Sequence, residues 1–584
     1  MFFRQKRSGN HVYLQIVENH WEKGRSRQRV VATVGRLDEL QRDGQLDGLL
    51  QSGAKFAEAS MVLSAHRRGD VPAIRCQSIG PALIFGRLWD ELHIGRTIER
   101  LLAGRHFEMP VERILFTTVL HRLFVSGSDR SCVQNWQHRH VIPGIETIPR
   151  IETIDLQHVY RSMAWLGEPL PDDQQAGATP FTASHDNVAA TNGFSPRCMK
   201  DTVEEALFER RRDLFSHLDL VFFDTTSIYF EGQGGQELGQ YGHSKDHRPD
   251  CKQIIVGAIL DAEGRPLCCE LWPGNVTDVK TLIPVVDRLQ KRFRIRSICI
   301  VSDRGMISKE TIAALQSPGR QVHYILGARL RNVKEIYEEV LSDDGPYREV
   351  FGPREKSTDP SPLQVKEVQV GDRRYVVCLN DEQARKDRAD REAIVESLQK
   401  QLRLGDKALV GNKGYRKYLR GEGPKFTIDE EKIIWEERFD GKWVLQTDLK
   451  DLSAEDVALQ YKRLWMVEEM FRAAKSLLET RPIFHKRDET IRGHVFCSFL
   501  ALLLRKELQD RLAAKGEKLE WAVVLRDLEA LQQTEVRDSS GKCFLLRSDL
   551  GETTSAVFRA VGVAIPPSVQ QIEESKTTQK CNMK

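Results

Sequence analysis

Two apolar runs, each ending on an aspartate, decide the fold: Leu218-Asp219-Leu220-Val221-Phe222-Phe223-Asp224-Thr225-Thr226 and Ser297-Ile298-Cys299-Ile300-Val301-Ser302-Asp303-Arg304-Gly305. Each run has the length and composition of a buried strand. Asp224 and Asp303 therefore occupy equivalent places, at the point where a strand ends. Because such places meet at one edge of a folded sheet, we expect the two carboxylates to lie close together.

Two carboxylates in one site repel each other and raise each other's pKa. A divalent cation removes this penalty, and Mg²⁺ prefers oxygen ligands of this kind. Two such ions, about 3.5–4 Å apart, stabilise the attacking and leaving oxygens of a phosphoryl displacement. For Asp224 or Asp303 taken singly, a role as a turn or capping residue is the alternative.

The segments around these runs complete an α/β pattern. Strands are expected at Ile254–Leu260, Pro266–Leu271 and Val322–Leu326, and helices at Val279–Phe293 and Lys309–Gln316. Three strands in a meander, then helix, strand, helix and strand, is the order of a ribonuclease-H-like fold. A generic α/β fold is the alternative, but the strict strand–helix alternation that favours it is absent. We therefore predict the α/β class, with a ribonuclease-H-like mixed sheet flanked by helices.

The third candidate carboxylate lies in Tyr461-Lys462-Arg463-Leu464-Trp465-Met466-Val467-Glu468-Glu469-Met470-Phe471-Arg472-Ala473-Ala474-Lys475, which is predicted to be helical. Tyr461, Glu468 and Lys475 are seven residues apart and share one helix face, with a drift of about 20° per heptad. Arg472 lies one turn after Glu468 on the same side. A solvated face with ion pairs is the alternative. The functional interpretation puts Glu468 on the metal ions and the basic groups on DNA phosphates.

The chain has 584 residues, which is too long for one core. Alternation in His11–Val17 and Arg29–Val34 predicts a β-hairpin, and apolar spacing in Ala82–Leu92, Val111–Ser126 and Leu156–Leu166 predicts helices. The predicted units are a basic β-rich N-terminal unit (1–60), a helical DNA-binding region (61–167), a linker (168–200), the first part of the catalytic core (201–330), a β-rich insertion (331–440), the second part of the core with the Glu helix (441–510), and a C-terminal helical region with a tail (511–584).

Charge and composition limit the possible functions and locations of the protein. The net charge is only +3, but residues 1–36 carry eight basic side chains against two glutamates, a net charge of +6. A local basic surface favours nucleic-acid binding, although solvated faces often have the same composition. No apolar run has the form of a signal peptide or the length of a membrane span, so we expect a cytoplasmic protein. The eleven cysteines form no Cys-x-x-Cys pair, which disfavours zinc ligation and a disulfide framework.

These residues resemble the DDE transposases of bacterial insertion sequences, in the branch with a β-rich insertion between the second Asp and the Glu. The matching stretches are Phe222–Ser227, Tyr241–Asp246, Val301–Gly305, and Tyr461–Lys475 with Arg481-Pro482, within about residues 215–505. Asp303 follows Asp224 by 79 residues and Glu468 follows Asp303 by 165, which leaves room for the insertion. Tyr461, Glu468 and Lys475 match the family's tyrosine–arginine–glutamate–lysine signature. Its arginine position holds Leu464, with Arg463 one place earlier.

The resemblance implies a transposase that cuts the ends of an element and joins them to target DNA, with Asp224, Asp303 and Glu468 as catalytic residues and metal ligands. The implied cofactors are two Mg²⁺ ions, which Mn²⁺ can replace. The implied partners are double-stranded DNA, as terminal inverted repeats and as target, and a second copy of the chain in the DNA complex. The bacterial cytoplasm is the expected location, at the nucleoid when DNA is bound. DNA contacts are expected from Tyr461, Arg463, Arg472, Lys475, His243 and Lys245.

Two other functions stay open: a nuclease of the same fold that never joins strands, and a catalytically inactive DNA-binding derivative. A simple nuclease needs no separate unit for recognising element ends, so the first 200 residues argue against it. The intact Asp224, Asp303 and Glu468 argue against an inactive derivative. Glu469 competes with Glu468 for the metal role, but it lies about 100° further round the helix and breaks the seven-residue register.

Overall fold

The computed structural model describes residues 2–9, 11–22, 25–42, 45, 46, 49, 73–125, 127–145, 153–174, 196–211, 220–295, 297–317, 320, 322–404, 415–422, 425–478, 480–537 and 541–572. The chain divides into two compact units. One comprises Met1–Leu83, His138–Val141 and Leu519–Lys584, and the other comprises Ile84–Gln137 and Ile142–Lys518. Both candidate runs and the Glu468 segment belong to the second unit.

A nine-stranded mixed sheet forms the centre of the second unit, with the strand order β10-β11-β12-β15-β9-β8-β5-β6-β7. Five of its strands come from the region of the two aspartates: β5 (Leu220–Tyr229), β6 (Gln253–Leu260), β7 (Pro266–Pro273), β8 (Ile298–Ser302) and β9 (Val322–Gly327). Strands β5, β6 and β7 form an antiparallel meander, whereas β8 pairs parallel to both β5 and β9. The meander, helix, strand, helix and strand expected from the sequence are present in that order.

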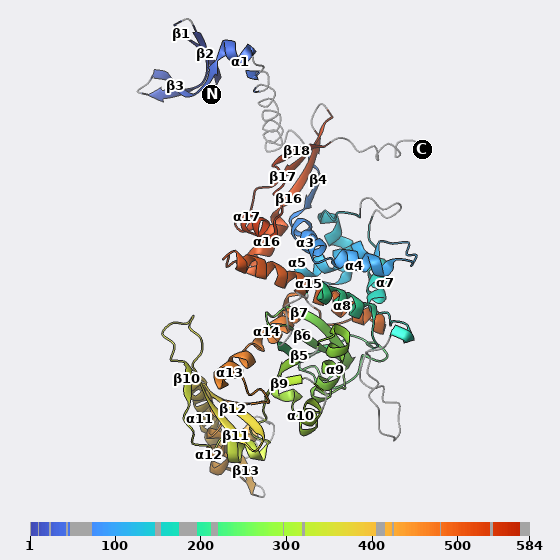
Figure 1. Cartoon of the computed structure of the whole chain (residues 1–584), viewed down its shortest axis with the longest axis vertical. Helices are drawn as coiled ribbons and strands as arrows, with labels where there is room; N and C mark the ends of the chain where they lie inside the picture. Colours follow the sequence, from blue (N-terminus) through green and yellow to red (C-terminus); the bar gives the residue numbers. More distant parts are fainter. Residues whose placement is uncertain are drawn as a thin grey trace. The chain divides into compact units, whose positions relative to one another are not determined.

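Helices cover both faces of these five strands. On one face α9 (Leu282–Phe293) and α10 (Lys309–Leu315) pack against every second residue of the strands, including Phe223 and Ile300. The opposite face is covered by α13 (Ala454–Lys462), α14 (Trp465–Arg472) and the start of α15 (Asp488–Ala514), which contact Phe222 and Val301. Figure 1 shows α9 and α10 on the other side of the strands from α13 and α14. The helix expected from residue 279 begins later, because a 3-10 turn, Asp278–Lys280, precedes α9.

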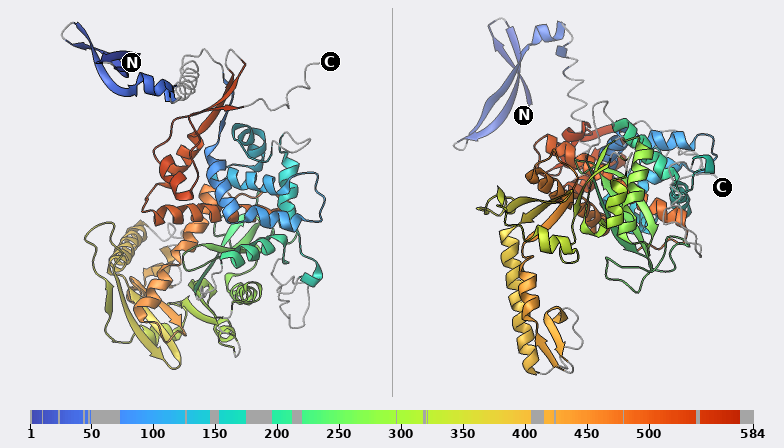
Figure 2. Two further views of the ribbon diagram at one scale, coloured as in Figure 1. Left: turned by 45° about the horizontal axis from the view of Figure 1, so that its top comes forward. Right: turned by 60° about the horizontal axis from the view of Figure 1, so that its bottom comes forward.

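The segment between β9 and β15 (Lys442–Thr447) extends the same sheet. Its strands β10 (Arg348–Phe351), β11 (Leu363–Val370) and β12 (Arg373–Leu379) lie beyond β15 at the sheet edge. The segment also holds the long helix α11 (Asp381–Leu404), the hairpin β13–β14 (Leu419–Glu422, Lys425–Ile428) and α12 (Glu430–Glu437). Apolar residues of α11 and of the β13–β14 region pack together in a small separate core (Figure 2). The insertion therefore contains helices as well as the expected strands.

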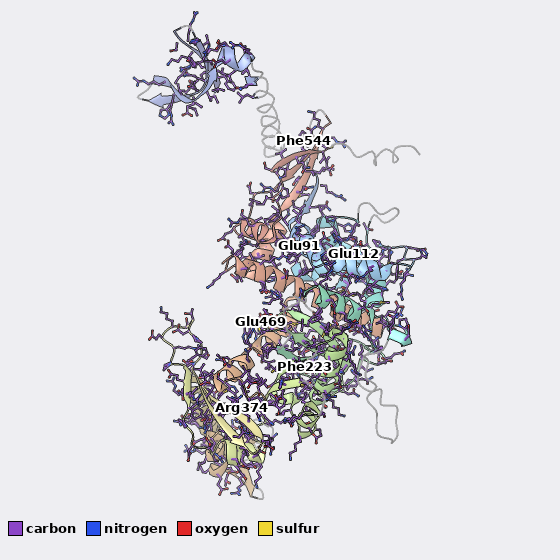
Figure 3. The ribbon with its side chains drawn as sticks, viewed as in Figure 1. Glu91, Glu112, Phe223, Arg374, Glu469 and Phe544 are labelled. Atoms are coloured by element: carbon purple, nitrogen blue, oxygen red, sulfur yellow. The ribbon has the colours of Figure 1, made fainter. Side chains whose placement is uncertain are left out.

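Arg374 of β12 links this edge to the helix that follows β15. Its guanidinium donates to the backbone oxygens of Leu449 and Leu452, the latter at 2.8 Å, directly before α13 begins. It also pairs with Glu367 of β11 at 2.7 Å. The side chain is nearly buried, and Figure 3 labels it. The insertion strands thus fix the start of the segment that carries Tyr461 and Glu468.

Helices α3 (Gly80–Glu91), α4 (Ile94–Leu102), α5 (Val111–Phe124) and α7 (Leu156–Leu166) form the helical region predicted from apolar spacing, although α4 was not expected. Most of the predicted linker 168–200 lies outside the described residues, and its last residues begin α8 (Met199–Arg211). Buried Arg292 of α9 joins α8 to the sheet, because it pairs with Glu204 at 2.6 Å and with Glu270 at 2.9 Å. Within the described residues, no helix is long and apolar enough to cross a membrane.

The first unit contains two small sheets. The N-terminal one is antiparallel and consists of β1 (Phe2–Ser8), β2 (His11–Glu22) and β3 (Arg25–Arg36), followed by α1 (Leu37–Arg42). The expected hairpin is present as β2 and β3, and β1 adds a third strand. The second sheet has the order β18-β17-β16-β4, from Val569–Ile572, Cys543–Arg547, Gln532–Arg537 and Ala73–Ser78, with α16 (Trp521–Ala530) and α17 (Thr554–Val561). The sequence patterns indicated helices and a polar tail there, and no sheet.

Candidate active site

Asp224 lies inside β5 and not at its end, which corrects the expectation from the sequence. The strand continues to Tyr229, but β8 accompanies it only as far as the pair Phe223↔Ser302. Asp224 is therefore the first residue of β5 beyond the part of the strand that pairs with β8. It has the parity of Phe222, so its side chain lies on the face that carries α13 and α14. The backbone amide of Thr225 donates to its Oδ1 at 2.7 Å.

Asp303 follows the last residue of β8 and precedes a short 3-10 turn, Arg304–Met306. The hydroxyl of Tyr461, near the end of α13, donates to Asp303 Oδ1 at 3.1 Å. Burial first, and then the nearby carboxylate, raise the pKa of Tyr461, so this phenol stays a proton donor. Gly327 makes room for the contact, because a Cβ there would lie 2.5 Å from the Tyr461 hydroxyl.

The electrostatics of Asp224 are those of a carboxylate that a bound cation would stabilise. Burial is the largest of the effects that raise the pKa of Asp224 to about 6, and the carboxylates of Asp303 and Asp278 act in the same direction. The ammonium of Lys245 and the amide of Thr225 act in the opposite direction, but they do not compensate for burial. Carboxylate oxygens are the ligands that Mg²⁺ and Mn²⁺ accept, so this donor set fits a divalent ion that would offset the charge.

Glu468 does not lie on one continuous helix with Tyr461 and Lys475, which corrects the prediction for this segment. Helix α13 ends at Lys462, α14 spans Trp465–Arg472, and a π-helical turn, Ala473–Leu477, follows. At the junction the amides of Leu464, Met466 and Val467 bond to carbonyls three residues back, so the chain tightens into 3-10 geometry. This turn allows Leu464 to become buried in the core under the sheet. The seven-residue spacing therefore does not define a shared face across the whole segment.

Within α14 the two glutamates face differently. Val467 and Phe471 are buried against the sheet. At about 100° per residue, Glu468 lies on the flank of this buried stripe, whereas Glu469 points about 180° away from its centre. Glu469 pairs with Arg472 at 2.7 Å, and Figure 3 marks it on α14. Glu468 is exposed and Glu469 is partly buried, so the approach of Glu468 to Asp224 stays a prediction.

Asp224, Asp303 and Glu468 are not drawn into one tight cluster. Among the described residues, the single group of three or more possible ligands whose atoms all lie within 4.8 Å of one another is Asp129, His485 and His494. A site with two ions spans a larger distance, because the ions themselves lie about 3.5–4 Å apart. Convergence of the three carboxylates around such ions stays a prediction.

The Asp129 group is better suited to a hydrogen-bonded network than to a metal. Nη2 of buried Arg122 lies 3.2 Å from Asp129 Oδ1 and 2.9 Å from His494 Nδ1. Burial and the Arg122 charge hold the pKa of His494 well below its usual value. His494 Nδ1 is the acceptor for Arg122 if Nε2 donates to the carbonyl of Thr480, 3.2 Å away. A divalent ion would have to displace a fixed positive charge from this place.

The predicted DNA-contacting cations gather beside Asp224. Lys245 Nζ lies 2.7 Å from the carbonyl of Thr225 and 3.0 Å from Asp278. Lys475 Nζ lies 2.8 Å from Asp246, which also pairs with Arg481. Burial lowers the pKa of Lys475, and the charges of Arg481 and Lys245 contribute to the shift. Three cations, Lys245, Lys475 and Arg481, thus lie next to the carboxylates of Asp246, Asp278 and Asp224.

The other predicted contacts have different surroundings. Arg463 donates to the carbonyl of Ala262 and lies over the Phe222 ring. Arg472 is exposed and paired with Glu469. His243 is exposed on the loop between β5 and β6, where its carbonyl accepts from Gln253 at 2.9 Å. Glu479, the expected partner of Lys475 in the ion-pair alternative, lies outside the described residues.

Sequence reasoning did not assign roles to Asp246, Asp278 and Arg481. Asp246 and Arg481 stand in stretches that carried the family resemblance, so a signal was present without a function. Asp278 accepts from Thr225 Oγ1 at 2.7 Å and pairs with Lys245. Its role depends on a loop contact between segments distant in sequence, which no local pattern indicates.

Comparisons with known proteins agree with this geometry. A family model described as a transposase DDE domain matches residues 216–504, and a model described as the N-terminal domain of IS1634 family transposases matches residues 3–65. A search of curated proteins finds no match. One similar solved structure is a piggyBac transposase synaptic complex with hairpin DNA, at 11% identity and a TM-score of 0.37, covering 77% of this chain and 78% of that chain. A likeness at this level carries no argument.

The family match defines an enzyme that cleaves DNA and transfers the cut strands. The chain belongs to the DDE transposases of insertion sequences, with a catalytic domain and an N-terminal domain that each match a transposase model. Enzymes of this family use divalent metal ions.

Proposed function

We propose that Asp224, Asp303 and Glu468 hold two Mg²⁺ ions on a ribonuclease-H-like core formed by β7, β6, β5, β8 and β9. The observation that carries this proposal is the half-buried Asp224, whose pKa is raised to about 6, first by burial and then by the nearby carboxylates of Asp303 and Asp278. The strand order and directions of these five strands support the fold assignment. Glu468 is the third ligand in this proposal because it holds the glutamate position of the family signature, seven residues from both Tyr461 and Lys475.

When bound, the ions would activate an oxygen nucleophile and stabilise the leaving oxygen at the scissile phosphate. The protein's part is to hold the ligands in place. Tyr461 orients Asp303 by its hydrogen bond, and Thr225 orients Asp224 through its backbone amide. Because Tyr461 reaches Asp303 from α13, movement of that helix would change the position of a metal ligand directly.

The cations beside Asp224 are proposed to receive the DNA backbone. Lys475 and Arg481 are both held by Asp246, and Lys245 lies on the carbonyl of Thr225. With metal ions on Asp224 and Asp303, these three cations would be placed to pair with a phosphate group. Leu464 is buried and supplies no cation, so we assign the missing arginine contact to Arg481. Tyr461, Arg463, Arg472 and His243 complete the set of proposed contacts.

The proposed DNA partners are the terminal inverted repeats of the element and the target duplex, bound by a pair of chains at the nucleoid. Residues 331–440 are proposed to act as an insertion lobe that contacts DNA near the site. Arg374 supports a mechanical link, because it ties this lobe to the residues before α13.

A plasmid assay tests the function. A donor plasmid that carries the element ends, incubated with the full chain and Mg²⁺, should give excised element and joined products. Products that are cut but never joined would indicate a nuclease instead. Asp224→Asn and Asp303→Asn should abolish cutting while duplex binding in EDTA changes little. Cutting by both variants at the normal rate would exclude these ligands.

A salt series tests the cation cluster. Lys475→Ala should weaken binding to every duplex alike and lower the slope of log affinity against log salt by about one unit. Arg481→Ala should have the same effect. Lys515→Ala, an exposed residue at the end of α15, removes the same charge as a matched control. Unchanged slopes for both cluster variants, with only a loss of thermal stability, would assign the cations to internal ion pairs.

A further inference from the structure

The N-terminal sheet has two chemically different faces. The register of β1, β2 and β3 places Arg4, Lys6, Gln15, Asn19, Gln28 and Thr33 on one side, which we call the polar face. Phe3, Leu14, Ile16 and Ala32 lie on the other side, which toward the hairpin end also carries Glu18, His20, Arg27 and Arg29. Helix α1 packs on that second side, because a Cβ on Gly35 opposite Leu14 would lie 3.4 Å from the Leu40 side chain. Figure 1 shows α1 beside β2 and β3.

The polar face is organised and not a random set of surface groups. Arg4 donates to Gln28 Oε1 at 2.9 Å and to Gln15 Oε1 at 2.8 Å, and Gln15 donates to Thr33 Oγ1 at 3.2 Å. Lys6, Asn19, Gln28 and Thr33 are exposed. An apolar row, Phe2, Val17 and Val30, crosses the same face, and Phe2 and Val30 are about two-fifths exposed, at 43% and 41%.

These residue types are the ones that read base edges. Arg and Lys recognise guanine, Asn and Gln recognise adenine, and apolar groups contact the thymine methyl. Three strands about 4.8 Å apart span about 10 Å between their outer backbones, and the major groove of duplex DNA is about 12 Å wide. At the hairpin end the edge strand β3 carries Arg27 and Arg29 on the side opposite to the polar face, and Arg29 lies 3.7 Å from Glu18.

We propose that the polar face of the N-terminal sheet enters the major groove of duplex DNA and reads the element ends, while Arg27 and Arg29 contact phosphates. The net charge of +6 within residues 1–36 complements the DNA backbone. The proposal rests on the transposase function of the chain, but it is independent of the metal ligands. Binding measured in EDTA therefore separates its failure from the failure of the proposed metal site.

The test uses the full chain and fluorescence anisotropy in EDTA. The probes are 40-base-pair duplexes from the two flanks of the gene, which contain the element ends, and one from the gene interior. Gln28→Ala and Asn19→Ala should each reduce the preference for flank over interior duplex about tenfold, because a lost base contact affects one sequence and not all. Arg29→Ala should weaken binding to all duplexes alike and lower the salt slope by about one unit.

Two controls test whether the effects are specific to the proposed face and to duplex DNA. Lys515→Ala should leave the preference for flank duplexes intact. An RNA duplex of the flank sequence should not compete, because its major groove is too deep and narrow to admit protein groups. The proposal is overturned if Gln28→Ala and Asn19→Ala, both folded by thermal melting, bind flank and interior duplexes like the parent chain. It is also overturned if the RNA duplex competes equally, or if these variants change self-association and leave DNA binding unaltered.

Discussion

Asp224 is the residue at which charge and burial conflict most directly. Its carboxylate lies among Asp303 and Asp278 in a buried place, and its pKa rises to about 6. A buried charge of this kind persists in a folded protein only when something stabilises it in the working state. The metal-free protein is therefore under electrostatic strain at this residue, and the strain has a measurable pH dependence.

Asp224→Asn should raise the melting temperature of the metal-free protein at pH 7.5 and have little effect near pH 4. The folded-state pKa lies above the ordinary value of 3.8, so the folded protein binds the extra proton and loses stability as pH rises between about 4 and 6. Mg²⁺ should raise the melting temperature of the parent chain at pH 7.5 and much less that of the variant. Calorimetry across this pH range measures both effects.

Asp250→Asn is the control of opposite sign. Arg248 holds the pKa of exposed Asp250 down to about 2, so its stabilising effect is present at neutral pH and is lost only as pH falls toward 2. The variant should be slightly less stable than the parent at pH 7.5. A melting temperature for Asp224→Asn at or below that of the parent at pH 7.5 would contradict the strain at Asp224.

Glu468→Gln should abolish DNA cleavage, and Glu469→Gln should reduce it less than about threefold. Glu468 lies on the flank of the buried stripe of α14, and Glu469 is engaged with Arg472 on the far side. A single-turnover cleavage assay on an element-end duplex measures the two rates. If Glu469→Gln is the inactive variant, the assignment of the third ligand is wrong.

At the scale of elements, the segment after Ser453 departs most from expectation. Its composition is helical throughout and contains no Pro or Gly, so nothing in the sequence marks the tight junction at residues 463–464 or the π-helical turn at Ala473–Leu477. Both irregularities arise from tertiary packing, because Leu464 is buried in the core and Lys475 reaches Asp246. π-Helical turns of this kind often occur at functional sites.

Leu464→Arg, which restores the family residue, should destabilise this chain by about 3–5 kcal/mol, because it would bury an unpaired charge. Leu464 is only 6% exposed and packs under the sheet. Leu464→Met is the matched control and should cost less than about 1.5 kcal/mol. Chemical denaturation measures both. A stable and more active Leu464→Arg protein would mean that the junction can turn to expose this position.

The five central strands could be predicted because each is a short apolar run between polar turns, and their order follows from the chain. The strands that pair with β15 could not be predicted in this way. Its six residues pair with β12 on one side and its last three pair with β9 on the other, so β15 joins the insertion strands to the central ones. Such pairing depends on which edges remain open after folding, and no local periodicity encodes it.

At the scale of the whole molecule, the sequence predicted the order of the units better than the pairing of strands that are distant in the chain. The sheet of β4 with β16, β17 and β18 brings together residues as far apart as Cys76 and Gln532, which are separated by 456 positions. Its strands are short and partly exposed, so their alternation is weak. The two aspartates were found because strand ends carry chemistry. Asp246 was not, because its partners Lys475 and Arg481 come from a distant segment.

The chain should assemble as a pair only on DNA. Cutting and joining two element ends requires two sites held together, and closed two-fold pairs are the commonest assembly. Analytical ultracentrifugation should give a single chain alone and two chains with two flank duplexes. A complex with one chain per duplex that still joins both ends would contradict pairing.

The separation of the candidate ligands along the chain also determines the order in which the parts of the site appear during synthesis. Strand β9 ends at Gly327 and its neighbour β15 begins at Lys442, so the ribosome must deliver 114 intervening residues before the sheet gains that neighbour. Glu468 emerges later still, whereas the N-terminal sheet leaves the ribosome first. A message broken before the codon for Glu468 therefore yields a polypeptide that carries the proposed DNA-reading face but lacks the proposed third ligand. Damaged copies of the element would then encode competitors of the intact enzyme instead of uncontrolled nucleases.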